Sequence, residues 1–580
     1  MSLVNKKAGW ILALIIISFF IYSFNLNNQL FWDDDDWIIG NNFVHDLSHV
    51  KEIFSTDILA GFGLNSNYYR PLLLLSFTFN YVVHGIEPLG YHLVSNGFHI
   101  LNGILIFFLL LGVFKKRLPA FLAALIFLIH PLQTEAVTYI SGRGDPMSVF
   151  FMLLSLWIFT KAQSLSRKTS KFWLLTSGSI ISFILAILSR ETAVLFPLLF
   201  MIFYISFLTK AGFWKSIWQS FVKAIPYFVI SGIYGILRLT VFNFQNTLNF
   251  YSQANEYTEH LSYRLFTFGH ALMDYFRLIF APLGLHMERD LAIKTSLFQW
   301  PVWLAVLILA GIIYVVIKKF KTNRIWFFAW AWFFVALGPV SGIIPINAII
   351  YEHWLYLPLI GFLALAGFYL DKLLSFAKNG WRMFLWVLLI GYLTFFGVAS
   401  IKRNIAWGNP TSFYEDILRY NPESVRIINN LANLYSERGE FKKAEEAYMR
   451  ALSINEGAGF AQPYYNLGNL YRDRGDISGA VEQYKKAIEV DPGFIFAYQN
   501  LAVVYVNQNE LANAALTLED LKKIKPNDPV IYYNLAVIYL AQQEKDLSLE
   551  NIQSGIKLSG SSELNAAFEY LLSQPEFKVE

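Results

Sequence analysis

Long apolar segments alternate with short polar ones up to about residue 405, and no comparable apolar run follows. A membrane-spanning helix needs roughly 20 consecutive, mainly apolar residues. The pattern therefore predicts an all-α, polytopic membrane domain of about eleven transmembrane helices in residues 1–405. The predicted spans lie near residues 9–26, 91–113, 118–137, 146–161, 172–188, 192–209, 222–240, 299–318, 325–342, 354–371 and 382–401.

Lysine and arginine are concentrated in alternate connections between these spans. Short loops rich in Lys and Arg face the cytoplasm. With eleven crossings, every basic loop falls on the same side: Lys6 and Lys7, Lys115–Arg117, Lys161–Lys171, Lys210 and Lys215, Lys318–Arg324, and Lys372 and Lys378. The N-terminus is then cytoplasmic, as an uncleaved first span. The opposite face receives the loops 27–90, 130–146, 189–191, 241–298 and 340–353 and the whole tail.

One further apolar stretch, residues 264–283, would break this parity if it crossed the membrane. It carries four ionisable side chains, Arg264, His270, Asp274 and Arg277. Such groups are costly in hydrocarbon. We therefore expect this stretch to lie at the membrane interface or to form a re-entrant element.

The tail repeats with a period of about 34 residues. A Leu-Ala or Leu-Gly pair recurs at Leu431, Leu467, Leu501 and Leu535, each followed by a tyrosine four positions after the leucine. Small residues let two antiparallel helices approach, and aromatic residues fill the gap between them. The pattern predicts a tetratricopeptide-repeat α-solenoid in residues 406–580, with about four repeats and a partial one at 413–422. Such a solenoid offers a concave groove for an extended peptide, or it only stabilises and spaces.

The amino-acid composition narrows the class of protein. The 580 residues are 55% hydrophobic and only 15% charged, with a net charge of +4. A soluble chain of this size carries more charge, and so small a net charge argues against nucleic acid as the partner. No cysteine is present, which excludes disulfides, thiolate nucleophiles and thiolate metal sites.

Four consecutive aspartates, Asp33–Asp36, follow the first span between two tryptophans. If its neighbours stay ionised, one of these carboxylates has a raised pKa and can act as a general base on a hydroxyl. Paired carboxylates can also bind a divalent cation through oxygen ligands. A solvated acidic loop is the alternative.

Other unusual polar residues share the predicted outer face. Arg70 can bind a lipid phosphate with its fork of donors, or it anchors an interfacial helix. Arginine and glutamate at span ends are costly unless paired, so a structural ion pair is the alternative for those residues. Glu352 and His353 contact a phosphate or an acceptor, or they cap the next helix. The remaining candidates are His130, Glu135, Arg143, Asp145, Arg190 and Glu191.

Arginines and histidines around an acidic cluster at one membrane face suggest an anionic, lipid-linked substrate attacked by a base-activated hydroxyl. No phosphate-binding Gly-x-x-x-x-Gly-Lys-Ser/Thr loop, serine triad or zinc spacing is present. A non-catalytic scaffold acting through the repeats is the alternative. A transporter or lipid flippase would show midplane polar residues and internal symmetry, and the sequence shows neither.

These residues resemble the transmembrane and tetratricopeptide-repeat-containing protein O-mannosyltransferases, which are C-type glycosyltransferases. The resemblance spans nearly the whole chain, and no single motif carries it. It rests on Phe31-Trp32-Asp33-Asp34-Asp35-Asp36 with Asn42, Tyr69-Arg70-Pro71-Leu72, Gly90-Tyr91-His92, His130-Pro131 with Thr134-Glu135-Ala136-Val137, Gly142-Arg143-x-Asp145, Arg190-Glu191 and Glu352-x-x-Leu355-Tyr356-Leu357-Pro358.

The resemblance implies inverting transfer of a sugar, typically mannose, from a polyprenyl-phosphate donor to Ser or Thr of an exported protein bound by the repeats. It places the acidic pair at Asp34 and Asp35, one as the base and the other as a positioning group. The donor phosphate then falls to Arg70, Arg143, Arg190 and His353, with Asp33, Asp36, His130, Glu135, Asp145, Glu191 and Glu352 in support. No cofactor and no metal are expected, although the Asp33–Asp36 cluster would tolerate a divalent cation.

The chain departs from the family pattern at three points. Four aspartates replace a pair, His353 stands where the family has arginine, and the repeats are few. The absence of cysteine and the compact tail favour a prokaryotic member that uses an undecaprenyl-type lipid. The expected location is the inner membrane, with the active site and the repeats on the periplasmic side.

Overall fold

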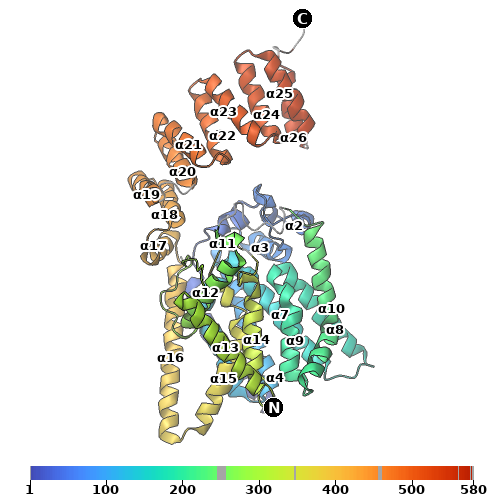
Figure 1. Ribbon diagram of the computed structural model, residues 1–580. Helices are drawn as coiled ribbons and strands as arrows, with labels where there is room; N and C mark the ends of the chain where they lie inside the picture. Colours follow the sequence, from blue (N-terminus) through green and yellow to red (C-terminus); the bar gives the residue numbers. More distant parts are fainter. Residues whose placement is uncertain are drawn as a thin grey trace. The chain divides into compact units, whose positions relative to one another are not determined.

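The computed structural model describes residues 2–244, 256–289, 291–344, 346, 348–454, 460–559, 561–574 and 577. Parts of the predicted outer loops 241–298 and 340–353 therefore lie outside the described residues. The described chain contains α, 3-10 and π helices and no strand, which confirms the all-α prediction. It forms two compact units, Met1–Phe413 and Tyr414–Glu580 (Figure 1).

The first unit is a bundle of long apolar helices. Among the described residues, nine helices are long and apolar enough to cross a membrane, and a bent pair makes a tenth. Ile325–Val340 is equally apolar but shorter, so these elements together account for the eleven predicted segments. The helices are α1 (Ser2–Tyr22), α2 (Val50–Ser55), α3 (Pro71–His84), α4 (Pro88–Phe114), α5 (Arg117–Ile129), α6 (Thr134–Thr138), α7 (Gly144–Ala162), α8 (Ser170–Ser189), α9 (Phe196–Phe203), α10 (Phe213–Leu239), α11 (Glu256–Glu259), α12 (Leu261–Phe280), α13 (Trp300–Phe320), α14 (Ile325–Leu337), α15 (Leu359–Phe376) and α16 (Asn379–Ala406).

The bent pair is the predicted span 118–137. The chain direction bends by 54° between its two parts, Arg117–Ile129 and Pro131–Thr138. The bend follows from sequence, because the residue before a proline is disfavoured in the α conformation. His130 fastens the bend: its Nδ1 accepts a hydrogen bond from Leu132 N at 3.2 Å, and its Nε2 lies 3.0 Å from the Ile279 carbonyl. His130 therefore shapes the backbone that presents Glu135.

Polar residues on α4 connect helices inside the bundle. The side-chain amide of Asn102 donates to the Tyr356 hydroxyl at 3.0 Å and to the Pro146 carbonyl at 2.8 Å. His99 Nδ1 lies 2.8 Å from the same hydroxyl. These groups are buried, and their hydrogen bonds to one another offset part of the cost of burying polar atoms. They fix α4 against α7 and the segment before α15.

The second unit consists of paired antiparallel helices. The first helix of each of four pairs ends in a left-handed residue, at Gly439 and Gly475 (φ +73° and +82°) and at Asn509 and Gln543 (φ +60° and +67°). This recurrence confirms the predicted repeats, since a left-handed residue ends a helix by a common capping motif. The helices are α18 (Val425–Glu437), α19 (Phe441–Ile454), α20 (Gln462–Asp473), α21 (Ile477–Val490), α22 (Ile495–Asn507), α23 (Leu511–Ile524), α24 (Pro529–Ala541), α25 (Lys545–Leu558) and α26 (Ser562–Leu572), after α17 (Pro410–Tyr420) at the boundary.

Candidate active site

The acidic cluster lies in the loop after α1, and this loop turns sharply at Trp32. The φ angle of Trp32 is +67°, a left-handed conformation that is strained for a bulky residue and persists only where the surroundings hold it. Phe31 packs against Trp407 and Phe413, with ring centroids 6.0 and 5.3 Å apart. Aromatic packing thus holds the strained turn at the start of Asp33–Asp36.

Asp34 is the buried member of the cluster, with 2% of its surface exposed. Its Oδ1 accepts hydrogen bonds from Ser141 N at 2.8 Å and Ser141 Oγ at 2.5 Å, and its Oδ2 accepts one from Phe31 N at 3.3 Å. Burial raises the pKa of Asp34 to about 7, although these hydrogen bonds oppose the shift. The carboxyl is therefore fixed in place and titrates close to neutral pH.

The other three aspartates have different surroundings. Asp35 is exposed, whereas Asp33 and Asp36 are partly exposed. Burial, followed by the charges of Asp33 and Asp34, raises the pKa of Tyr139 well above its ordinary value, so these two carboxyls lie close to Tyr139. The predicted pair Asp34–Asp35 is thus divided between the interior and the surface, while Asp33 and Asp34 share a neighbour.

Arg70 and Arg190 each face a carboxylate. Arg70 Nε donates to Glu191 Oε2 at 2.8 Å, and Arg190 Nη1 lies 2.7 Å from Asp145 Oδ2. The Arg70 guanidinium is also 5.7 Å from the centroid of the Trp37 ring, directly after the acidic cluster. Four predicted site residues from three separate segments therefore lie together, and Arg70 lies close to the residue that follows the acidic cluster.

Arg143 has different surroundings from Arg70 and Arg190. It is fully buried and packs on the Phe77 ring at 4.7 Å. Its Nε donates to Ser95 Oγ at 3.0 Å, its Nη1 to Asn80 Oδ1 at 2.7 Å and its Nη2 to the Tyr91 carbonyl at 2.9 Å. All three nitrogens are engaged inside the protein, so Arg143 fastens α3 and α4 to the start of α7. We do not retain it as a ligand of the donor phosphate.

Glu135, Glu352 and His353 form a second group of predicted residues. Glu135 Oε1 lies 2.5 Å from His353 Nδ1, and Glu135 Oε2 accepts a hydrogen bond from Glu352 N at 3.2 Å. Burial lowers the pKa of His353 to about 4, and the neighbouring charges that act on it include Asp145 and Arg190. His353 therefore contacts the second group, the charges of the first group act on it, and burial favours its neutral form.

Four residues of this region were not singled out from the sequence: Tyr139, Arg289, Arg403 and Trp407. Arg289 Nη2 donates to Glu352 Oε1 at 2.7 Å, and Arg403 Nη2 lies 3.6 Å from Glu352 Oε2. The Arg403 guanidinium is 5.8 Å from the Trp407 ring, and Trp407 stacks on Tyr139 with centroids 5.4 Å apart. An aromatic residue and an arginine at the end of a span are typical of interface anchors, so local sequence contains no signal for these contacts.

We call these neighbours the polar ring. Asp34 is bonded to Ser141, one helical turn before Asp145, and Asp145 pairs with Arg190. The charges of Asp145 and Arg190 act on His353, which contacts Glu135. Glu352 and Arg403 lie next to Glu135, and Arg403 lies against Trp407, which stacks on Tyr139. The ring thus brings carboxylates, arginines and a neutral imidazole to one end of the bundle. Its members are Asp33, Asp34, Ser141, Asp145, Arg190, His353, Glu135, Glu352, Arg403, Trp407 and Tyr139.

A metal centre is not apparent in the part of the chain that the structure describes. No group of three or more His, Cys, Asp or Glu side chains there is arranged to hold an ion. In the acidic cluster, only Asp34 is buried, and its oxygens already accept hydrogen bonds from the protein.

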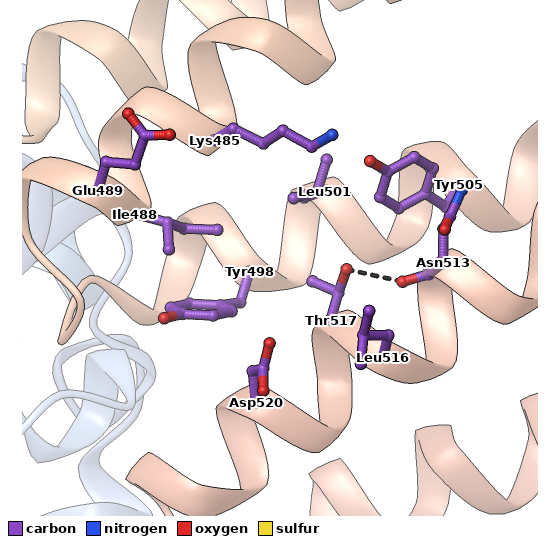
Figure 2. Close-up of a pocket in the computed structure, with 10 residues that line it drawn as sticks. All are labelled: Lys485, Ile488, Glu489, Tyr498, Leu501, Tyr505, Asn513, Leu516, Thr517 and Asp520. Carbon is purple, nitrogen blue, oxygen red and sulfur yellow. Dashed lines mark hydrogen bonds between the residues drawn. The ribbon is translucent and has the colours of Figure 1, made fainter.

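The repeat unit contains a pocket of about 300 Å³ between α21 and α23, over α22 (Figure 2). Leu501 and the partly exposed Ile488 supply apolar surface, and Leu516 at its edge is 63% exposed. Lys485 points toward Tyr505, with its Nζ 5.9 Å from the ring centroid. The pocket combines an apolar floor with a charged rim, which suits a peptide side chain and its flanking polar groups.

The repeats match two family profiles. Residues 425–457 match the profile described as "Tetratricopeptide repeat", and residues 468–509 match the one described as "TPR repeat". The chain is also 26% identical over 458 residues to a protein O-mannosyl-transferase of Caenorhabditis elegans, covering 77% of this chain and 62% of the relative. It is 22% identical over 463 residues to a mouse protein O-mannosyl-transferase, covering 74% of this chain and 49% of the relative. Over most of its length, this chain is similar to the protein O-mannosyl-transferases.

The similarity to the protein O-mannosyl-transferases confirms the resemblance seen in the motifs. A match over 77% of the chain is longer than the first unit, so it includes part of the repeats as well. The chain spans only about half to three fifths of the length of these curated relatives. Among solved structures, a crystal structure of MamA protein is 21% identical and covers 26% of this chain and 80% of its own, with a TM-score of 0.23.

Proposed function

We propose that the protein transfers a sugar, with mannose as the first candidate, from a polyprenyl-phosphate donor to Ser or Thr hydroxyls of exported proteins. The names of its relatives support glycosyl transfer. The observation that carries the proposal is the Asp34 carboxyl, which is buried and held by Ser141. It lies next to the partly exposed Asp33, and the polar ring that contains both also contains buried arginines.

We assign the base to Asp33 and the positioning role to Asp34. A base must reach the acceptor hydroxyl, and Asp33 is partly exposed, whereas Asp34 uses both oxygens inside the protein. This assignment moves the acidic pair one residue toward the N-terminus of the predicted Asp34–Asp35. Asp35, which is exposed, is the alternative base.

In the proposed reaction, Asp33 takes the proton of the acceptor hydroxyl while the hydroxyl oxygen attacks the anomeric carbon of the sugar. The bond between that carbon and the phosphate oxygen breaks, and polyprenyl phosphate leaves with the bonding electron pair. Attack from the face opposite the phosphate inverts the configuration at the sugar carbon. No metal is required, because arginine can balance the phosphate charge.

Arg70 and Arg190 remain the proposed phosphate contacts from the predicted set. Both are buried or nearly so and both are held by carboxylates, Glu191 and Asp145, which fix the direction of their remaining donors. Arg190 Nε has no partner among the described residues, so it is available to an anion. His353 is better placed to hold Glu135 than to bind phosphate, because its Nδ1 already faces that carboxylate.

The proposed orientation has the N-terminus in the cytoplasm and the polar ring on the periplasmic side of the inner membrane. Support comes from the basic loops, which fall on one side if the predicted crossings hold. Nucleotide sugars are absent from that compartment, so a lipid-linked donor is required there.

The sharpest test is transfer in detergent from undecaprenyl-phosphate-mannose to Ser/Thr peptides at different pH values. Because the pKa of Asp34 is about 7, the carboxyl loses its proton as pH rises through that value, and only the ionised form accepts all three hydrogen bonds. We expect the transfer rate to rise about tenfold between pH 6 and pH 8, with a midpoint close to 7.

Asp34→Asn is expected to abolish this midpoint, and Asp35→Asn is the matched control that should keep it. An unchanged midpoint in Asp34→Asn would contradict the positioning role. Absence of transfer by the full chain from any polyprenyl-phosphate sugar would reject the proposed function.

The repeats are proposed to bind the acceptor protein. We expect Leu516→Asp, at the edge of the pocket, to raise KM for a protein acceptor about tenfold, which corresponds to ~1.4 kcal/mol of binding. The rate with a short peptide acceptor should not change. Leu547→Asp on α25, a partly exposed leucine outside the pocket, is the control. Equal losses for protein and peptide acceptors would show that the pocket is not used for capture.

A further inference from the structure

Two arginines outside the predicted set, Arg289 and Arg403, lie on either side of the Glu352 carboxylate. Arg289 Nη2 donates to Glu352 Oε1 at 2.7 Å, and Arg403 Nη2 lies 3.6 Å from Glu352 Oε2. The backbone N–H of His286 also donates to Oε1, at 2.8 Å. Both arginine side chains are more than nine-tenths buried, with exposed fractions of 7% and 4%.

One donor of Arg289 has no partner in the part of the chain that the structure describes. Its Nη2 serves Glu352 and the Gly284 carbonyl, at 3.0 Å, whereas its Nε is buried without a partner among the described residues. The side-chain amide of Gln133, on a turn that contacts α16, is also buried without a hydrogen-bond partner among the described residues. Buried polar groups are nearly always satisfied, and the exceptions point to a ligand or a water.

The two arginines also belong to the polar ring or contact it. Arg403 lies against Trp407, which stacks on Tyr139 beside the acidic pair. This part of the ring is separate from Arg70 and Arg190, which pair with Glu191 and Asp145. The structure thus contains two pairs of arginines that are held by carboxylates.

A second arginine pair fits the charge change of the proposed reaction. The donor is a phosphodiester with one negative charge, and the leaving polyprenyl phosphate is a monoester with nearly two at neutral pH. Negative charge therefore grows on the phosphate as the sugar leaves. Cations that contact it stabilise the transition state more than the ground state, and arginine donors match phosphate geometry.

We propose that Arg289 and Arg403, held by Glu352 between them, form an anion site for the phosphate of a lipid-linked substrate. Glu352 keeps the two guanidiniums in register. The phosphate accepts a hydrogen bond from Arg289 Nε, and Arg403 contributes the second positive charge. The identity of the ligand rests on the proposed sugar transfer, but binding of the phosphate can be measured without any transfer.

The test measures binding of undecaprenyl phosphate to the full chain in detergent by native mass spectrometry. Undecaprenol, which lacks the phosphate, is the comparison ligand. Arg289→Gln and Arg403→Gln are each expected to weaken binding of the phosphate lipid at least tenfold. Arg277→Gln is the control, since Arg277 is an exposed residue of α12 that pairs with Asp274. Inorganic phosphate added as a competitor separates recognition of the phosphate from recognition of the lipid.

Because Arg403→Gln leaves Glu352 with one partner fewer, the double variant Glu352→Gln/Arg403→Gln keeps the buried charge balanced. It too should bind weakly while it melts near the parent temperature. Parent-like binding by folded Arg289→Gln and by the double variant would overturn the proposal. So would a parent protein that binds undecaprenyl phosphate no better than undecaprenol. If the variants lose binding as expected but the parent transfers sugar to no acceptor, the anion site stands and the proposed function is rejected.

Discussion

Asp33→Asn is expected to lower the rate of sugar transfer at least about a hundredfold, while binding of the donor lipid is retained. Asparagine preserves the size of the side chain but cannot take the proton of the acceptor hydroxyl. General base catalysis contributes about 10²–10⁴-fold to a rate, and the loss should appear in kcat rather than in KM. The measurement is single-turnover transfer from undecaprenyl-phosphate-mannose to a Ser/Thr peptide at pH 8, where Asp34 is ionised.

Asp35→Asn is the matched control for this prediction, since it removes a neighbouring carboxylate of the same cluster. Asp35 is exposed, whereas Asp34 is buried and bonded to Ser141. We expect its transfer rate to stay within about twofold of the parent rate, as is usual for a surface change. If Asp35→Asn were inactive and Asp33→Asn active, the register predicted from the sequence would stand and the assignment made from burial would fail.

The fold was largely predictable, because its main signals are local. Apolar length alone located the membrane helices, and the spacing of small and aromatic residues located the repeats. The bend before Pro131 was not anticipated, although a proline at that position disfavours a continuous helix. Burial and strain on single residues, such as the left-handed Trp32, depend on packing by distant aromatic rings and leave no local signal.

The candidate site was predictable only in part. Placing the basic loops on one side assigned Arg70, Asp145, Arg190 and Glu191 to the same face, and the structure brings them together. The contact between Tyr139 and Trp407 joins segments far apart in the chain. Sequence reasoning cannot find such pairs from spacing. Nor can it distinguish a buried arginine that packs, like Arg143, from one that binds substrate.

Glu352→Gln is expected to destabilise the membrane unit strongly, by about 3–5 kcal/mol. The side chain is fully buried, and it accepts hydrogen bonds from Arg289 and His286 and balances the charge of Arg403. Burial raises the pKa of Glu352, and the charges of Arg403 and Arg289 then oppose that shift. Removing one partner from a buried charge network leaves the other charges uncompensated, which costs about this much. Thermal unfolding followed by tryptophan fluorescence would measure it as a clear fall in melting temperature.

The matched control is Asp371→Asn, which removes a carboxylate from a different ion pair of the same unit. Asp371 lies 2.8 Å from Lys116, whose side chain is 61% exposed. A solvent-exposed pair contributes only about 0–1 kcal/mol, so this variant should melt close to the parent. Equal effects of the two changes would mean that Glu352 does not hold buried arginines in place. Adding Arg403→Gln to Glu352→Gln should restore the melting temperature. Such recovery would show that the uncompensated arginine causes the loss, because the second change removes the positive charge that the first left without its counter-charge.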